Sequence, residues 1–273
     1  MRVTTPNSQT TSLPQRRRAA DGVNRRFSAT SRALLAEFVG TALLVTVVIG
    51  SGIAAAQLSP GDVGIQLLEN SIATAFGLGV LILLFGPVSG AHFNPVVSLT
   101  DWLLGRRAES RVSGRSVAAY VAAQVSGGIA GAVLANVMYN RAALELATKD
   151  RLTTGHLIGE VVATAGLIAL IFALARTGRA ALSAAAVGAY IGAAYWFTSS
   201  TSFANPAVTL GRMFSDTFAG IAPNSVLPFI AAQIVGALIG LALVVALYPD
   251  AAETADQAVI PHARRSAESR SEP

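Results

Sequence analysis

The sequence predicts an all-α membrane protein with six transmembrane helices and two re-entrant half-helices in an inverted repeat. Hydrophobic residues fill 52% of the 273 positions and charged residues 13%, and the mean hydropathy of +0.54 is too high for a soluble domain of this length. Six apolar stretches are long enough to cross a bilayer, which takes about 20 residues. Two Asn-Pro pairs, Asn94-Pro95 and Asn205-Pro206, follow long apolar stretches, and the apolar run that each pair begins is too short to cross a bilayer.

The chain begins with a polar segment, residues 1–31, which is rich in Ser, Thr and Arg and predicts a disordered basic tail. A cleavable signal peptide is the alternative, but the first apolar run is too long for one. Residues 249–273 are again polar and are predicted to form a second disordered tail. Between the tails, the predicted spans are 33–56, 68–88, 116–139, 156–175, 181–200 and 225–248.

Positive charge is unevenly distributed among the tails and loops. Arginines concentrate in the N-terminal tail, in 105–115 and in 176–179, whereas 57–67 has no basic residue and 141–155 has three. Because positively charged loops stay in the cytoplasm, the sequence predicts a multi-pass cell-membrane protein with both termini cytoplasmic. This distribution accounts for the formal net charge of +5 and excludes a nucleic-acid partner.

The two halves of the chain are related. Residues 36–42 are similar in sequence to residues 159–165, and residues 122–127 are similar to residues 231–236. Each half contains three spans and one Asn-Pro half-helix, and since three is odd, the second half must enter the membrane upside down. The predicted organisation is a first repeat, a connecting loop and a second repeat, at residues 32–140, 141–155 and 156–248.

Each repeat carries one Glu and one Gln inside its spans, at Glu37 and Gln124 in the first and Glu160 and Gln233 in the second. A carboxylate within the membrane is a candidate proton relay. Equivalent placement in both repeats instead favours a structural acceptor for backbone N–H groups in the irregular segment before each half-helix. The two glutamines are assigned the same structural role.

Each Asn-Pro pair predicts a helix start, because Asn is a good N-cap and Pro suits the first helical turn. A helix N-terminus exposes unpaired N–H groups and carries about half a positive charge. Two such helix ends meeting near the middle of the bilayer would repel a cation and bind the oxygen atom of an uncharged molecule such as water. Irregular backbone at that depth must be buried in protein or line a wet cavity, so the pair is predicted to form the waist of a pore.

These residues resemble the aquaporin (major intrinsic protein) family of water and small-solute channels. The resemblance covers about residues 32–248 and rests on both Asn-Pro boxes, the Ser89 to Phe93 lead-in and the repeated Glu and Gln. It implies the aquaporin-like fold, a pore in each protomer of a homotetramer in the lipid bilayer, and proton and ion exclusion at the boxes. The implied constriction comprises Asn94, Pro95, Val96, Asn205, Pro206 and Ala207, with both Asn side chains donating to the passing molecule.

The resemblance also implies a selectivity filter formed by Phe76, Ala193, Ser202 and Val208. Val208 departs from the family pattern, which usually has Arg three residues after the second Asn; Val96 stands in place of the common Ala. A filter lacking this Arg is predicted to be wide and to pass water and small uncharged solutes such as glycerol-like polyols, urea or neutral metalloids such as arsenite. Arg212, one turn further along, is either a partial substitute for the missing charge or an interface anchor.

His92 is predicted to line the pore, with a pH gate as the alternative because His titrates near neutrality. The chain has no Cys and three His, so no metal site and no cofactor are predicted. An intramembrane hydrolase built on Ser89 or Ser98 with His92 lacks an activating group, and the protein is therefore predicted not to be an enzyme. A coupled secondary transporter remains the alternative function, since that class also uses inverted repeats and broken helices.

Overall fold

The computed structural model describes residues 28–105 and 114–248. Regular structure in these ranges is entirely helical. The helices are α2 (Ala29–Leu58), α3 (Val63–Ser89), α4 (Pro95–Gly105), α5 (Gly114–Met138), α6 (Thr154–Arg176), the short 3-10 helix η1 (Ala180–Leu182), α7 (Ser183–Phe197), α8 (Pro206–Arg212) and α9 (Pro223–Leu247). The predicted tails, 1–31 and 249–273, lie outside the described residues except for 28–31, where α2 begins.

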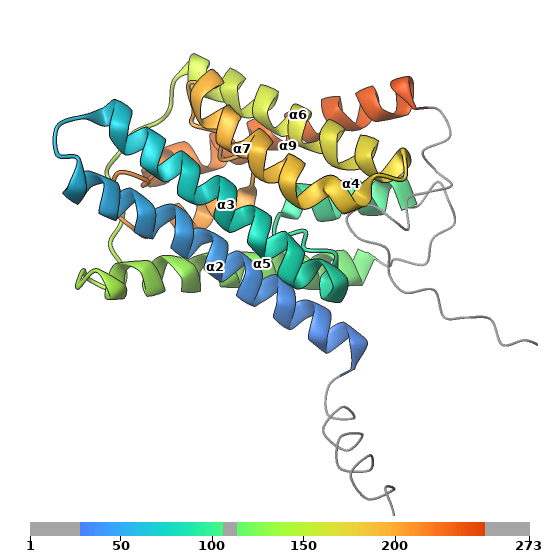
Figure 1. The fold of residues 1–273 in the computed structure, drawn as a ribbon, viewed down its shortest axis with the longest axis horizontal. Helices are drawn as coiled ribbons and strands as arrows, with labels where there is room; N and C mark the ends of the chain where they lie inside the picture. Colours follow the sequence, from blue (N-terminus) through green and yellow to red (C-terminus); the bar gives the residue numbers. More distant parts are fainter. Residues whose placement is uncertain (1–27, 106–113, 249–273) are drawn as a thin grey trace, which may run out of the picture.

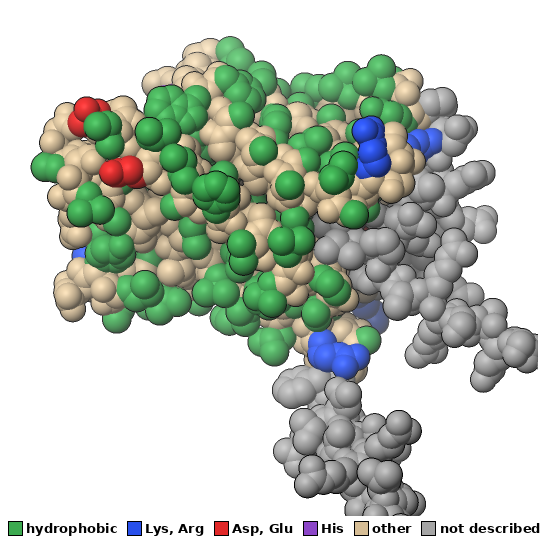
Figure 2. Space-filling model, in the orientation of Figure 1, with side chains coloured by type: hydrophobic (Ala, Val, Ile, Leu, Met, Phe, Trp, Pro, Cys, Tyr) green, Lys and Arg blue, Asp and Glu red, His purple; other side chains and the backbone are tan. Residues whose placement is uncertain are grey.

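Six of these helices are long and apolar enough to cross a membrane: α2, α3, α5, α6, α7 together with η1, and α9. Their bounds agree with the six predicted spans to within a few residues, and the all-α fold class is confirmed. On the face seen in Figure 2, apolar side chains are spread over the described residues, with the acidic groups near one end and most of the basic groups near the other. Such a surface suits a lipid environment.

Side-chain caps fix where several helices begin. The Asp62 carboxylate accepts from the backbone N–H of Ile65 at 2.9 Å, and the Thr153 hydroxyl accepts from that of His156 at 3.2 Å. Each cap satisfies one of the N–H groups that a helix start leaves unpaired. At the opposite end of α3, Gly90 adopts a left-handed φ of 88°, which ends the helix just before the first Asn-Pro box.

The helices pack as two matching halves: α2 lies along α5, α6 lies along α9, and α3 meets α7 across the bundle (Figure 1). Glycines make the tightest of these approaches possible. A methyl group on Gly131 of α5 would overlap the carbonyl oxygen of Ala42 on α2, and one on Gly240 of α9 would lie 2.5 Å from that of Ala165 on α6. Equivalent small residues therefore hold equivalent helix pairs together.

The half-helices α4 and α8 occupy the centre of the bundle. Each packs against both α5 and α9, so each is held by one span of its own repeat and one of the other, and the two half-helices also contact each other. The buried apolar core surrounds them and draws on both repeats, with Ile49 and Val45 from α2 and Ile168 from α6 fully buried. This arrangement places both Asn-Pro boxes at the middle of the fold.

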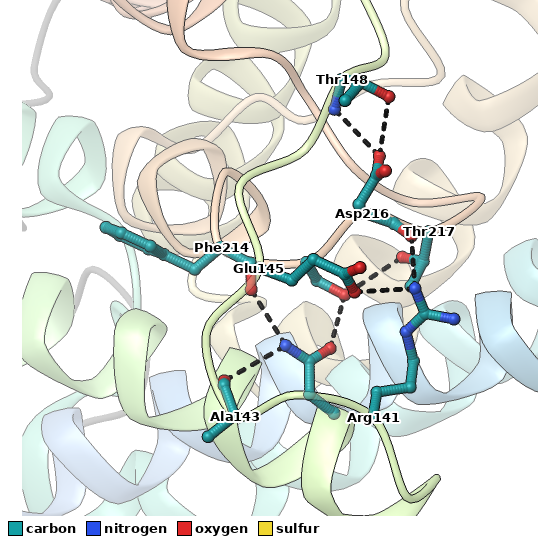
Figure 3. Close-up of polar contacts among 9 residues, drawn as sticks. Arg141, Ala143, Glu145, Thr148, Phe214, Asp216 and Thr217 are labelled. Carbon is teal, nitrogen blue, oxygen red and sulfur yellow. Dashed lines mark hydrogen bonds and ion pairs between the residues drawn. The ribbon is translucent and has the colours of Figure 1, made fainter.

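The segment between the repeats, 139–153, runs across one end of the bundle and is tied to the segment that follows α8 (Figure 3). The backbone N–H of Ala147 donates to the Met213 carbonyl at 2.9 Å. The Arg141 guanidinium bonds both the Glu145 carboxylate and the carbonyl oxygen of Asp216, at 2.7 and 2.9 Å. Together these contacts fix the chain around the C-terminal end of α8.

Candidate pore and selectivity filter

Each of the two Asn side chains forms a hydrogen bond to the lead-in of the other repeat, at the centre of the molecule. The Asn94 amide nitrogen donates to the Ala204 carbonyl at 2.8 Å, and that of Asn205 donates to the Phe93 carbonyl at 2.7 Å. Each amide oxygen caps its own half-helix, because Asn94 accepts from Val96 N–H and Asn205 from two backbone N–H groups at the start of α8. An amide nitrogen has two hydrogens, so each Asn retains one for a passing molecule.

The lead-in to each box has the same unusual backbone. Ala91 and Phe93 have φ of 49° and 47°, and Ser202 and Ala204 have φ of 49° and 46°. These are the residues three and one before each Asn, and none is Gly. Left-handed conformations cost roughly 1–2 kcal/mol for such residues, so the surrounding structure must hold them in place.

Glu37 supplies that support in the first repeat. One carboxylate oxygen accepts from the Ser89 hydroxyl at 2.6 Å and the His92 N–H at 3.0 Å. The other accepts from the Phe93 N–H and the Gln124 side-chain amide, both at 2.7 Å. Glu37 is fully buried, and four donors offset the cost of burying its charge.

Glu160 has the same place in the second repeat. It is also fully buried and accepts from the backbone N–H groups of Phe203 and Ala204, both at 2.9 Å. The Gln233 amide donates to it at 2.6 Å. Both carboxylates thus hold the irregular lead-ins through backbone N–H groups, in the positions that symmetry between the repeats requires.

A cavity runs past both Asn side chains. About 60 Å³ of it is open to the centres of water molecules, several times the roughly 10–15 Å³ that one water requires. Both lead-ins, residues 91–94 and 202–205, contribute to its lining. The spans contribute mainly apolar side chains: Leu44, Val48, Leu78, Ile82, Leu167, Ile171, Val187 and Ile191.

The structure does not place two of the predicted filter residues at this cavity. Phe76 lies on the outer surface of α3, where 74% of its side chain is exposed, and Ala193 lies exposed on α7. Thr74 and Tyr195, two residues away on the same helices, line the cavity instead, and their hydroxyls are 3.1 Å apart. A shift of two residues turns a helical side chain by about 200°, which moves it from the pore to the outer surface.

The other two predicted filter residues, Ser202 and Val208, do line the cavity. The Ser202 hydroxyl is buried and has no hydrogen-bond partner among the described residues. With Thr74 and Tyr195, it brings the hydroxyl-bearing side chains in the cavity lining to three, whereas the predicted filter had one. Val208 adds an apolar surface on the first turn of α8.

His92 also lines the cavity, on the side of the first repeat. Its ring Nδ1 is 3.0 Å from the Ser98 hydroxyl, and its ring lies 5.6 Å from that of Tyr120. Among residues 28–105 and 114–248, no three His, Asp or Glu side chains come together as a metal site would require.

The remaining residues of the two Asn-Pro boxes do not line the cavity. Pro95 and Pro206 begin α4 and α8, while Val96 and Ala207 are buried and outside the cavity lining. Val97 in the first repeat lines the cavity, and it is the counterpart of Val208, three residues after its Asn.

Comparison with known proteins agrees with this geometry. The sequence profile of the family described as Major intrinsic protein matches residues 24–204. The chain belongs to the major intrinsic protein family. Over 213 residues it is 48% identical to the aquaglyceroporin AqpS of Rhizobium meliloti (strain 1021), spanning 78% of this chain and 88% of that protein. It is 32% identical over 220 residues to the glycerol uptake facilitator protein of Pseudomonas aeruginosa, spanning 69% of this chain and 75% of that relative.

The major intrinsic protein fold is also found among solved structures similar to this one. The aquaglyceroporin from Plasmodium falciparum superimposes with a TM-score of 0.58, covering 79% of this chain and 95% of that chain at 20% identity. The family resemblance seen in the sequence is confirmed. Spacing within the family motif marks the boxes, but it did not reveal Thr74 or Tyr195.

Proposed function

We propose that this protein is a passive transmembrane channel for water and small uncharged solutes. The observation that carries the proposal is a cavity that passes both Asn amide groups, which are fixed by reciprocal hydrogen bonds at the meeting point of two half-helices. The names of its relatives, an aquaglyceroporin and a glycerol uptake facilitator, support transport of glycerol-like solutes. The family consists of channels, which supports a function without catalysis.

Ion and proton exclusion would follow from the same centre. The N-termini of α4 and α8 both meet at the boxes, and each carries about half a positive charge. A water that accepts from the free amide hydrogens of Asn94 and Asn205 must point its own hydrogens away from the centre. No continuous chain of hydrogen bonds can then carry a proton across this point.

The solute class follows from the side chains around Ser202. One cavity is lined by Ser202, by the hydroxyl pair of Thr74 and Tyr195, and by apolar Val208. The Ser202 hydroxyl has no hydrogen-bond partner among the described residues. A small molecule with hydroxyl groups on one side and an apolar side matches this lining, as glycerol does. Neutral metalloid hydroxides such as arsenous acid have the same hydroxyl groups, and urea offers N–H donors and a carbonyl acceptor instead.

The assembly would be a homotetramer in the lipid bilayer with both termini cytoplasmic. Six spans place the start of α2 and the end of α9 toward the same end of the bundle (Figure 1). Arg115, Arg176 and Arg179 flank the spans at this end, as expected of a cytoplasmic face. The homotetramer rests on the family resemblance.

Stopped-flow light scattering on proteoliposomes tests this proposal. The full chain should conduct water together with glycerol, urea or arsenite, without saturation and without response to an imposed proton gradient. Val208→Arg should narrow the cavity and lower glycerol flux by roughly tenfold while water flux continues. Water flux with none of these solutes would refute the proposed selectivity, and flux driven by the proton gradient would indicate a coupled transporter.

A further inference from the structure

Arg212 is a buried cation that forms no ion pair with a carboxylate of residues 28–105 or 114–248. Its side chain is 2% exposed and lines the same cavity as Asn94, Asn205 and Val208. Among the described residues, its Nε donates to the Ala219 carbonyl at 2.5 Å, and neither terminal nitrogen has an acceptor. Burying an unpaired charge is costly, and a charge kept inside a membrane protein is by default a functional candidate.

The position of the guanidinium is fixed by contacts with Phe203 and Ala219. It stacks on the Phe203 ring at 3.4 Å from the ring centroid, and Phe203 belongs to the lead-in that also carries Ser202. Val208 and Arg212 are four residues apart on α8, so they share a face about one turn, or roughly 6 Å, from each other. The backbone of Arg212 therefore lies one turn beyond Val208, and its side chain reaches back to Phe203 of the lead-in.

Two further cations strengthen the positive potential at this place. Arg151 lies over the same Phe203 ring and donates to the Gly220 carbonyl at 2.8 Å, and Lys149 donates to the Phe218 carbonyl at 3.1 Å. Carbonyl oxygens, and no carboxylates of the described chain, accept from all three cations. Burial, together with the nearby positive charge of Arg151 and Arg212, lowers the pKa of Lys149 to about 8.

We propose that Arg212 is the specificity-determining cation of this channel and that the filter divides two tasks between neighbouring turns of α8. Val208 leaves the aperture wide and apolar. Arg212, one turn further along α8, repels cations and offers its free N–H groups to a solute hydroxyl. The inference rests on the proposed channel function. A solely structural role, in which Arg212 anchors the segment after α8 through Ala219, makes a different prediction for ion permeation.

Ion permeation through the full chain in proteoliposomes separates these roles. A unit charge about 6 Å from a passing cation, at an effective dielectric constant of about 20, changes the crossing rate roughly a hundredfold. Arg212→Met should therefore raise Na⁺ uptake by about that factor while glycerol flux continues. Arg212→Lys should keep Na⁺ out, and Arg141→Met, which removes a charge from the same end of the bundle outside the cavity, should have no effect.

A second test restores the positive charge at position 212 by chemical modification, so that the conclusion does not depend on one substitution. Because the chain has no Cys, Arg212→Cys introduces the single thiol, and a cationic methanethiosulfonate reagent then restores a positive charge after folding. Na⁺ exclusion should return with the cationic reagent and not with a neutral methyl reagent. Met fills the site without a polar atom, so this variant should assemble even if the Cys variant does not.

The outcomes are distinct. If the Met and Cys variants conduct glycerol and still exclude Na⁺, Arg212 is a structural anchor and the inference is wrong. If the Met and unmodified Cys variants admit Na⁺, while Arg212→Lys and the Cys variant treated with the cationic reagent exclude it, the inference holds. If the wild-type protein conducts no glycerol, urea or arsenite, the proposed function fails instead, whatever the Na⁺ measurements show.

Discussion

Replacing the Glu160 carboxylate by an amide tests whether it is a structural acceptor. In the wild-type protein, one oxygen accepts from Phe203 N–H and the other accepts from both Ala204 N–H and the Gln233 amide. Glu160→Gln puts an NH₂ group where one of these oxygens was, and that group faces an N–H donor. At least one charge-assisted hydrogen bond is lost and one buried N–H is left unpaired.

The two losses set the size of the effect. A hydrogen bond to a charged group contributes about 1.5–3 kcal/mol, and an unsatisfied buried donor costs about 1–3 kcal/mol. We expect Glu160→Gln to lower stability by about 3–4 kcal/mol, which corresponds to a fall in the melting temperature of roughly 10 °C for a chain of this size. Glu37→Gln should lower it at least as much, since Glu37 accepts from four donors.

Thermal melting in detergent, followed by the fluorescence of Trp102 and Trp196, measures these shifts. Glu145→Gln is the matched control: the same substitution at an exposed carboxylate, whose single ion pair with Arg141 contributes less than about 1 kcal/mol. If Glu160→Gln melts with the control and changes only proton-coupled flux, the carboxylate is a proton relay and the structural argument is refuted.

Two further predictions concern the filter and the helix contacts. Tyr195→Phe leaves Thr74 without its hydroxyl partner and should lower the ratio of glycerol to water flux, with a stability loss of about 1 kcal/mol; an unchanged flux ratio would remove this hydroxyl pair from the filter. Gly131→Ala places a methyl group against the Ala42 carbonyl oxygen and should cost about 1–3 kcal/mol in a thermal melt. Gly155→Ala, where the nearest atom is 3.6 Å away, is its control, and equal melting temperatures would contradict the close packing of α2 against α5.

The spans and the boxes could be predicted from the sequence because each has a strong local signal. A span is recognised by its length and apolarity, and Asn94 and Asn205 carry the helix-start chemistry in the motif itself. The support from Glu37 and Glu160 could be anticipated because the repeats place them equivalently. All of these features are defined by which residues follow one another along the chain, and that can be read directly from the sequence.

Which face of a span meets the cavity could not be predicted in the same way. Phe76 faces outward and Leu78 lines the cavity, although both are apolar. In a soluble protein the outer face would be polar and would mark the helix orientation, but lipid and an apolar pore wall favour the same residues. Motif spacing was the remaining guide to the filter, and an error of two residues in Phe76 and Ala193 was enough to select the wrong face.

The burial of the Arg151 side chain could not be predicted from the sequence either. Arg151 lies in the connecting loop, where sequence patterns predict an exposed cation, yet it is 5% exposed. Its burial depends on the carbonyl oxygens of Phe218 and Gly220, which are nearly 70 positions away. Only the folded arrangement of both loops brings those acceptors to it.

The reciprocal hydrogen bonds of Asn94 and Asn205 couple the two repeats at the centre of the molecule. Asn94 bonds the second lead-in and Asn205 bonds the first, so neither repeat can complete the centre alone, and a change at either Asn disturbs both. Among the described residues, Val208 makes no hydrogen bond to the other repeat, although it and its counterpart Val97 both line the cavity. A substitution at Val208 can therefore change the size or charge of the cavity lining while both Asn hydrogen bonds remain in place.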